Sequence, residues 1–340
     1  MNLSALEPSL NSQPLSVSSD SRALVSVENL ETTFYLKSGP FRAVNNISYE
    51  INKGETLGIV GESGCGKSVT SFSLMRLIER PGKITRGRFL LGGRDVLSAP
   101  ESQMEEIRGG DMAMIFQEPM TALNPVLTIG FQIDEQIIKH KKCSPKEARE
   151  RSIEMLKLVG IPSPESRYTN YPHQLSGGMR QRAMIAMALS CDPKFLIADE
   201  PTTALDVTIQ AQILELIQKL QSQFHMSVQF ITHDLGVISE VSDKVLVMYG
   251  GQMCEKAPTQ TLFTSPKHPY TAALIESRPK LGQRSARLKT IEGSVPAPHE
   301  LPAGCPFVNR CMRAKSECSH QKPMPTMVAP DHSVACFNPL

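Results

Sequence analysis

Eight consecutive residues near position 60 carry the pattern of a loop that binds phosphate. They follow the apolar run 56–60, precede a helix-like pattern, and read Gly61-Glu62-Ser63-Gly64-Cys65-Gly66-Lys67-Ser68. Glycines let backbone N–H groups turn toward phosphate oxygens, and the positive end of the following helix adds to the attraction. Lys67 is suited to reach the outer phosphates and the Ser68 hydroxyl to coordinate Mg²⁺. Alone, the loop predicts only a site for nucleotide phosphates; a purely structural glycine-rich turn is the alternative.

Two acids follow a second short apolar run, 195–198, and these are Asp199 and Glu200. Beside a phosphate loop, Asp199 is placed to hold Mg²⁺ through water, and Glu200 to polarise the attacking water. Acids that simply follow a strand are usually solvated turn residues. The two acids therefore indicate a catalytic site only in combination with the phosphate loop. The loop and the acids together predict hydrolysis of a nucleoside triphosphate.

The elements that must position these residues alternate between strands and helices. Short, continuously apolar runs are typical of strands buried on both faces of a sheet, and they occur at 56–60, 112–116, 195–198, 227–232 and 245–249. Helical periodicity between several of them predicts a parallel α/β sheet. Earlier strand-like runs predict a small antiparallel sheet, and they lie at 24–27, 34–36 and 43–51.

The length of 340 residues suggests about two domains. We expect a disordered tail at 1–22 and a nucleotide-binding domain at 23–258 with a helical subdomain at about 120–190. A proline-rich module with four cysteines should occupy 259–340.

Composition narrows the function classes. Hydrophobic residues make up 40%, charged residues 21%, and the net charge is +2, which excludes wholesale disorder, a coiled coil or collagen. The near-neutral balance gives no reason to expect nucleic acid as a partner. No apolar stretch approaches the roughly 18–20 residues of a membrane span, and the first 22 residues do not look like a secretory signal. We therefore expect a cytosolic chain whose eight cysteines are thiols or metal ligands before disulfides.

A third motif, between the loop and the acids, is Leu175-Ser176-Gly177-Gly178-Met179. Here the sequence resembles the ATP-binding subunits of ABC transporters, and the resemblance covers roughly 23–260. Met179 replaces the glutamine common in the family, but the serine and both glycines are kept. The resemblance implies an α/β P-loop NTPase fold of the ABC ATPase type, with ATP and Mg²⁺ as ligands and hydrolysis coupled to transport.

The same resemblance assigns roles to single residues. Gln117 matches the Q-loop, Asp206 the D-loop at 204–206, and His233 the switch histidine. Phe34 lies where the family stacks an aromatic ring on adenine, with an ordinary core phenylalanine as the alternative. The implied catalytic residues are Lys67, Gln117, Glu200 and His233, and the implied Mg²⁺ ligands are Ser68, Gln117 and Asp199. The implied nucleotide contacts are Phe34, Gly61, Glu62, Ser63, Gly64, Cys65, Gly66, Lys67, Ser68, Val69, Gln117, Ser176, Gly177, Gly178, Asp199 and Asp206.

A closer resemblance is to the ATPases of oligopeptide and dipeptide importers, and it rests on Asn124-Pro125, on Tyr171-Pro172-His173-Gln174 and on His268-Pro269-Tyr270-Thr271. It implies two integral-membrane permeases, an extracytoplasmic solute-binding protein and a paralogous ATPase as partners. In the family, two ATPases stack head to tail, and each ATP lies between one phosphate loop and the serine–glycine stretch of the other subunit. A heterodimer is implied, with a homodimer left open.

This reading places the chain on the cytoplasmic face of the inner membrane, with 116–131 as the surface that contacts a permease. Another solute such as nickel is an alternative cargo. An ABC-type ATPase acting on ribosomes or DNA is a rival, but the chain has one cassette, no sustained heptads and no basic patch. A regulatory protein that no longer hydrolyses ATP is a third reading, against which Lys67, Asp199, Glu200 and His233 argue.

Four cysteines near the end of the chain have the spacing C-x5-C-x6-C-x17-C. They are Cys305, Cys311, Cys318 and Cys336. Thiolates suit Fe–S clusters or Zn²⁺, and Zn²⁺ sites usually contain C-x2–4-C pairs that are missing here. The wider gaps, with the importer resemblance, favour a [4Fe–4S] cluster of structural or regulatory role. Zn²⁺ and unliganded thiols are the alternatives.

Overall fold

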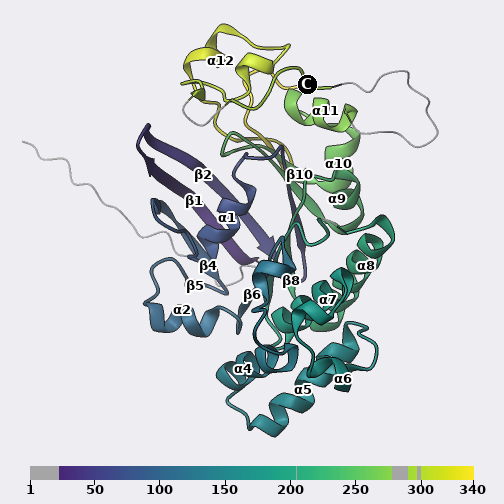
Figure 1. The fold of residues 1–340 in the computed structure, drawn as a ribbon. Helices are drawn as coiled ribbons and strands as arrows, with labels where there is room; N and C mark the ends of the chain where they lie inside the picture. The colour runs from purple at the N-terminus through teal and green to yellow at the C-terminus, as the bar shows by residue number, and fades with distance from the viewer. Residues whose placement is uncertain (1–22, 204, 278–289, 297–299) are drawn as a thin grey trace, which may run out of the picture.

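The computed structural model describes residues 23–203, 205–277, 290–296 and 300–340 (Figure 1). The predicted tail at 1–22 and Ala204 of the predicted D-loop lie outside these residues.

The first layer is an antiparallel sheet with the strand order β2-β1-β4-β5. Its strands are β1 (Ala23–Leu36), β2 (Gly39–Asn52), β4 (Gly82–Leu91) and β5 (Arg94–Asp95). The strands β1 and β2 are longer than the short apolar runs predict, because they continue through irregular pairing. Asn29 and Asn46 have φ values of 48° and 56°, which asparagine tolerates better than most residues. The predicted antiparallel sheet is thus confirmed, and its strands continue through these positions.

The second layer is a mixed sheet with the order β11-β12-β10-β9-β3-β8-β7-β6. Its parallel part matches the five predicted runs within a residue or so, and consists of β3 (Thr56–Val60), β6 (Met112–Ile115), β7 (Phe195–Asp199), β8 (Ser227–Ile231) and β9 (Lys244–Tyr249). Antiparallel strands extend the sheet beyond β9, and they are β10 (Gln252–Pro258), β12 (His332–Val334) and β11 (Thr326–Ala329). The C-terminal segment therefore contributes two strands to the main sheet.

Alternate side chains of the parallel strands point into two different cores. Phe195 and Ile197 pack with the antiparallel sheet, whereas Leu196 and Ala198 pack with the helices on the other face. Because both faces are covered, these strands are buried along their whole length. β8 lies between β3 and β7, and the three strands run parallel. Their carboxyl ends therefore meet at the same edge of the sheet.

Helices surround this frame, with α8, α9 and α10 on the side of the main sheet away from β1 and β2 (Figure 1). They are α1 (Lys67–Leu74), α2 (Glu101–Ile107), α3 (Pro119–Ala122), α4 (Ile129–Lys141), α5 (Pro145–Leu158), α6 (Pro164–Tyr168), α7 (Gly177–Leu189), α8 (Val207–Phe224), α9 (Leu235–Val241), α10 (Thr259–Thr264), α11 (Pro269–Glu276) and α12 (Ser316–His320). The apolar face of α8 is buried through Ile213, Ile217 and Leu220.

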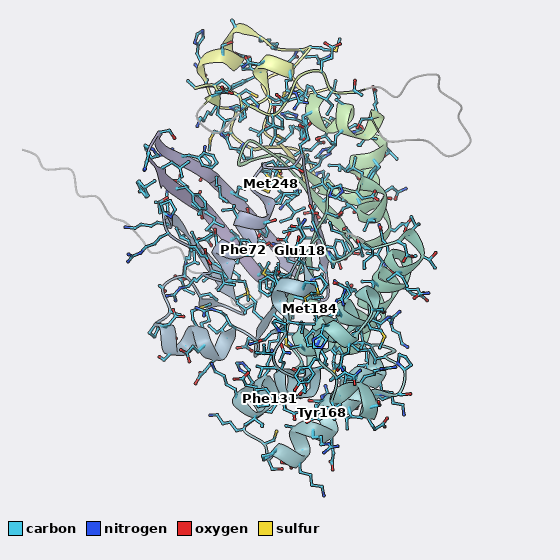
Figure 2. The ribbon with its side chains drawn as sticks, viewed as in Figure 1. Phe72, Glu118, Phe131, Tyr168, Met184 and Met248 are labelled. Carbon is cyan, nitrogen blue, oxygen red and sulfur yellow. The ribbon has the colours of Figure 1, made fainter. Side chains whose placement is uncertain are left out.

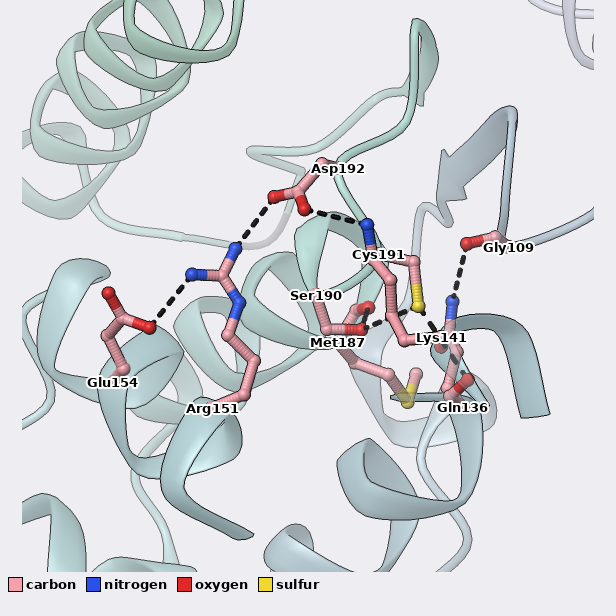
Figure 3. Close-up of polar contacts among 9 residues, drawn as sticks. All are labelled: Gly109, Gln136, Lys141, Arg151, Glu154, Met187, Ser190, Cys191 and Asp192. Atoms are coloured by element: carbon pink, nitrogen blue, oxygen red, sulfur yellow. Dashed lines mark hydrogen bonds and ion pairs between the residues drawn. The ribbon is translucent and has the colours of Figure 1, made fainter. Parts of the chain in front are cut away.

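The segment 119–189, much of which the sequence predicts as a helical subdomain, contains α3 to α7, and Figure 2 shows Phe131 and Tyr168 at this end of the molecule. One carboxylate joins its parts (Figure 3). Asp192, which follows α7, accepts from Lys141 of α4 at 2.9 Å and from Arg151 of α5 at 2.7 Å. The Cys191 thiol is also 3.6 Å from the Gln136 carbonyl oxygen of α4. These contacts hold the end of α7 and the approach to β7 in one orientation relative to α4 and α5.

Candidate functional site

The predicted phosphate loop connects β3 to α1. Two of its glycines are sterically required, because a Cβ on Gly61 would lie 2.3 Å from the Met248 carbonyl oxygen and one on Gly66 would lie 2.3 Å from that of Ala43. Gly66 is the N-cap of α1, with a φ of 98°, and no side chain caps the helix. The first N–H groups of α1 are therefore left for an anion, which the helix dipole also favours.

Lys67 is the first residue of α1, and its side chain folds back over the loop. Its relative exposure is 6%, and its Nζ donates to the carbonyl oxygens of Gly61 at 2.8 Å and Glu62 at 3.2 Å. Nζ also lies 3.9 Å from Cys65 Sγ. A buried ammonium whose hydrogen-bond partners are two carbonyls and a thiol is a strong attractor for a phosphate. The cation thus lies inside the ring of backbone that the loop forms.

Ser68 and Asp199 meet beside the loop, since β3 and β7 end at the same edge. The Ser68 hydroxyl donates to Asp199 Oδ1 at 3.1 Å. Burial raises the pKa of Asp199 from its ordinary value of 3.8 to about 6, while the Ser68 hydrogen bond lowers it. Hydroxyl and carboxylate oxygens are suitable Mg²⁺ ligands, and a bound cation would favour the ionised carboxylate. The pair can therefore hold a divalent metal next to bound phosphates.

The Glu200 side chain contacts two further residues of the predicted site, Gln117 and His233. It has a φ of 46°, and its backbone N–H donates to the Ile231 carbonyl oxygen at 2.9 Å. Its carboxylate accepts from Gln117 Nε2 at 3.1 Å and lies 3.3 Å from His233 Nδ1. The structure therefore brings Gln117, Glu200 and His233 together at the ends of β6, β7 and β8. Such a carboxylate, oriented by an amide and an imidazole, can act on a water molecule.

The serine–glycine motif lies on a different part of the fold. Ser176 is the N-cap of α7 and accepts from the Met179 N–H at 3.3 Å, and Asp206 caps α8 through the Ile209 N–H at 3.0 Å. Gly178 lies close to α8, because its Cβ would be 3.2 Å from Ile209 Cγ2. Figure 1 shows α7 beside α8 and near α4, α5 and α6, whereas α1 lies against β1 and β2. These predicted contacts are not gathered with the phosphate loop within one chain.

The remaining predicted nucleotide contact, Phe34, is half-buried near the end of β1. Its ring stacks on Phe41 with 6.4 Å between centroids, and a Cβ on Gly82 would lie 2.8 Å from it. The next residue, Tyr35, is 52% exposed and was not singled out from the sequence. Both rings therefore lie at this end of the antiparallel sheet.

All eight cysteines are free. The four C-terminal ones line a single small cavity together with His268 and Phe307. Burial, with a smaller contribution from the neighbouring Cys318, Cys336 and Cys311, raises the pKa of the Cys305 thiol to about 11. Among the described residues, no group of three or more Cys, His, Asp or Glu side chains is arranged closely enough to hold a metal ion.

Three residues that contact the site were not predicted from the sequence. The Thr203 hydroxyl donates to the Glu200 carboxylate at 2.8 Å. Its position three residues after Glu200 was the only sequence signal that could have indicated this contact. The Tyr270 hydroxyl accepts from the Glu62 N–H at 3.0 Å, and Arg310 donates to the Glu62 carboxylate at 2.8 Å. These two are 208 and 248 residues away in the chain, so no local pattern could reveal them.

Two family profiles match the sequence. One is the ABC transporter family, over residues 44–203, and the other is the C-terminal region of oligopeptide/dipeptide transporters, over residues 254–318. The oligopeptide transport ATP-binding protein AppD of Bacillus subtilis is 51% identical over 315 residues, which cover 92% of this chain and 96% of that protein. The dipeptide transport ATP-binding protein DppD of Escherichia coli is 47% identical over 318 residues, with coverage of 94% and 97%.

Solved structures agree with this comparison. A dimeric ATP-binding cassette in a post-hydrolysis state, bound to ADP and Pi, has a TM-score of 0.63 and 27% identity. The match covers 69% of this chain and 98% of that one. A second dimeric structure of the same cassette, MJ0796, described as a bacterial ABC transporter cassette, has a TM-score of 0.62 and 28% identity, with coverage of 69% and 98%. The predicted α/β P-loop fold of the ABC ATPase type is confirmed.

Proposed function

The chain belongs to the ABC transporter family, and we propose that it is the ATP-hydrolysing subunit of an importer for dipeptides or oligopeptides. The observation that carries this proposal is the similarity to AppD and DppD along nearly the whole chain, including the C-terminal region typical of such transporters. Neither rival reading of the sequence explains that C-terminal match.

In this proposal the phosphate loop holds the ATP phosphates. Backbone N–H groups of 61–66 and the start of α1 surround the phosphates, and Lys67 leaves its carbonyl partners to contact the outer ones. Ser68 and Asp199 would hold Mg²⁺, which when bound would neutralise charge that develops on the phosphates. The open N-terminus of α1 supports this assignment.

Hydrolysis then depends on Glu200. Its carboxylate orients the attacking water and accepts its proton, while Gln117 and His233 hold the carboxylate and sense the terminal phosphate. The hydrogen bond from Thr203 adds a third partner that restrains the carboxylate. The three side chains that contact Glu200 come from different segments. Movement of any of these segments would therefore change how the carboxylate orients the attacking water.

We further propose that two ATPase subunits close on each ATP, with Ser176, Gly177 and Gly178 of one facing the loop of the other. The separation of α7 from α1 in one chain and the dimeric form of a similar cassette, seen in two structures, support this. The partner is a paralogous ATPase, with a second copy of this chain as the alternative.

We assign the contact with the permease to 116–131, a segment that includes Gln117 and leads into the helical subdomain. Exposed apolar side chains support a docking role, since Met120, Val126 and Phe131 are 52%, 75% and 53% exposed. In the described part of the chain, no helix is apolar and long enough to span a bilayer. The subunit then binds the cytoplasmic face of the inner membrane through two integral-membrane permeases, which receive solute from an extracytoplasmic binding protein.

For the four C-terminal cysteines we propose a [4Fe–4S] cluster, with Zn²⁺ as the alternative. All four line one cavity, and the thiol donor set suits either centre, but the thiols as they stand are too far apart to hold a metal ion and would have to move together on binding. A bound cluster would supply a covalent brace for a loop-rich segment. Iron, sulfide and zinc analysis of anaerobically purified protein, together with its visible absorbance, distinguishes the two. Protein that contains neither iron nor zinc would disprove both.

The function is tested by Lys67→Ala in cells that depend on this subunit for uptake of a labelled dipeptide. Loss of the buried ammonium should abolish uptake and ATP hydrolysis while the complex with the permeases still assembles. Lys146→Ala, at an exposed lysine of α5, is the matched control and should transport normally. Uptake that persists in Lys67→Ala would refute the ATPase role, and uptake of nickel instead of peptide would change the cargo.

A further inference from the structure

The phosphate loop, which attracts anions, itself contains a carboxylate. Glu62 is the second residue of the phosphate loop, and its side chain is 25% exposed. An unpaired carboxylate here would oppose the approach of a triphosphate, because like charges close together raise the free energy of the bound state. The loop therefore needs a cation other than Lys67 to offset Glu62.

Arg310 of the C-terminal segment supplies that cation. Its Nη1 donates to Glu62 Oε2 at 2.8 Å and Oε1 at 3.2 Å, and its side chain is only 7% exposed. The other donors of the guanidinium are also occupied, by the carbonyl oxygens of Ile291, Glu292 and Gly293 at 2.9–3.3 Å. Arg310 is thus fixed by its own segment and offers one nitrogen to the loop.

An aromatic platform holds this contact in place. The rings of Tyr249, Tyr270 and Phe307 pack with centroid distances of 4.8–5.3 Å, and Arg310 lies 5.7 Å above the Tyr249 ring. The Tyr249 hydroxyl accepts from Arg310 at 3.2 Å, and that of Tyr270 accepts from the Glu62 backbone N–H. Both the main chain and the carboxylate of Glu62 are therefore held from the C-terminal side.

We propose that Arg310 is a positioning residue for nucleotide binding: it neutralises Glu62 and fixes the phosphate loop, so that the C-terminal segment sets the affinity for ATP. This inference rests on the proposed function, since it assumes that the loop binds ATP. Arg310 itself does not touch the nucleotide in this scheme. Its effect passes through Glu62, so the two residues should be energetically coupled.

The test is a double-mutant cycle on the full-length chain, with ATP binding measured by calorimetry at fixed salt. Arg310→Ala should weaken ATP binding about tenfold, because Glu62 keeps its charge and loses its partner. Glu62→Gln should bind ATP at least as tightly as the parent chain. The double variant Arg310→Ala/Glu62→Gln should return to within about threefold of Glu62→Gln, because no carboxylate then needs neutralising.

Arg313→Ala is the matched control. Arg313 lies in the same segment but contacts Asn338 and Pro339 rather than the loop, so ATP affinity should change less than about twofold. Arg310→Gln serves in place of the alanine variant if the latter does not fold. An unchanged affinity in the Arg310 variants, or a double variant as weak as the single one, overturns the inference. A parent chain that fails to bind ATP, or a Lys67→Ala variant that still binds it normally, overturns the proposed function instead.

Discussion

Asp199→Asn should make the nucleotide-free subunit more stable while strongly weakening its response to MgATP. Asp199 is 2% exposed, and burial raises its pKa from 3.8 to about 6. A shift of this size corresponds to about 3 kcal/mol of unfavourable free energy for holding the ionised carboxylate in the folded state. Asparagine keeps an oxygen that can accept from the Ser68 hydroxyl but carries no charge.

The pH dependence has a defined sign. Between pH 3.8 and about 6 the folded state retains a proton on Asp199 that the unfolded state has released. The free energy of unfolding contributed by this group therefore falls as pH rises through that window and stays low above it. Asp199→Asn removes this loss, so its advantage should be small at the acid end of the window and reach about 2–3 kcal/mol above neutrality.

Thermal unfolding at several pH values measures this advantage, which should appear as a Tm increase of several degrees at neutral pH. Asp331→Asn is the control, since that carboxylate is 68% exposed and should shift Tm little. Added MgATP should raise the Tm of the parent chain and raise that of Asp199→Asn much less. A variant no more stable than the parent at neutral pH, or equally stabilised at all pH values, would refute the burial argument.

Three further changes probe other parts of the scheme. Glu200→Gln should slow ATP hydrolysis by about 100-fold or more while ATP binding is kept, so ATP-dependent dimers should accumulate on size-exclusion chromatography; unchanged hydrolysis would contradict the role given to this carboxylate. Tyr49→Phe removes the donor to Gln229 Oε1, a buried bond of 2.6 Å, and should cost about 1–3 kcal/mol in chemical denaturation; an unchanged midpoint would show that Gln229 finds another partner. Phe131→Arg should abolish peptide uptake yet leave the hydrolysis rate of the isolated subunit unchanged, and normal uptake would remove this side chain from the permease surface.

The sequence predicts the parallel part of the sheet well because those strands are short, uninterrupted and apolar. The antiparallel sheet was harder, since β1 runs through Asn29 and β2 through Asn46, both with positive φ. Polar residues at such positions look like turns in a linear sequence. In the fold they are irregularities within long strands, because pairing on either side of them is strong enough to continue the ladder.

The site was predictable where local sequence carries the chemistry. The loop of 61–68 follows β3, Asp199 ends β7 and Glu200 follows it, and parallel strands end at the same edge, so their meeting was expected. The role of His233 was implied by the resemblance to ABC ATPases, and its Nδ1 lies 3.3 Å from the Glu200 carboxylate. Arg310 could not be found like this, because nothing near residue 310 indicates which of many carboxylates its guanidinium contacts.

The C-terminal segment reaches the phosphate loop by two separate routes. Its strand β12 pairs with β10, β10 with β9, and β9 with β3, whose end leads into the loop. Arg310 reaches the same loop directly through Glu62. Cys311 follows Arg310 in the chain and lines the cavity shared by the four cysteines. Any ligand that orders those cysteines therefore also fixes the backbone that carries Arg310, and through it the charge at the entrance of the nucleotide site.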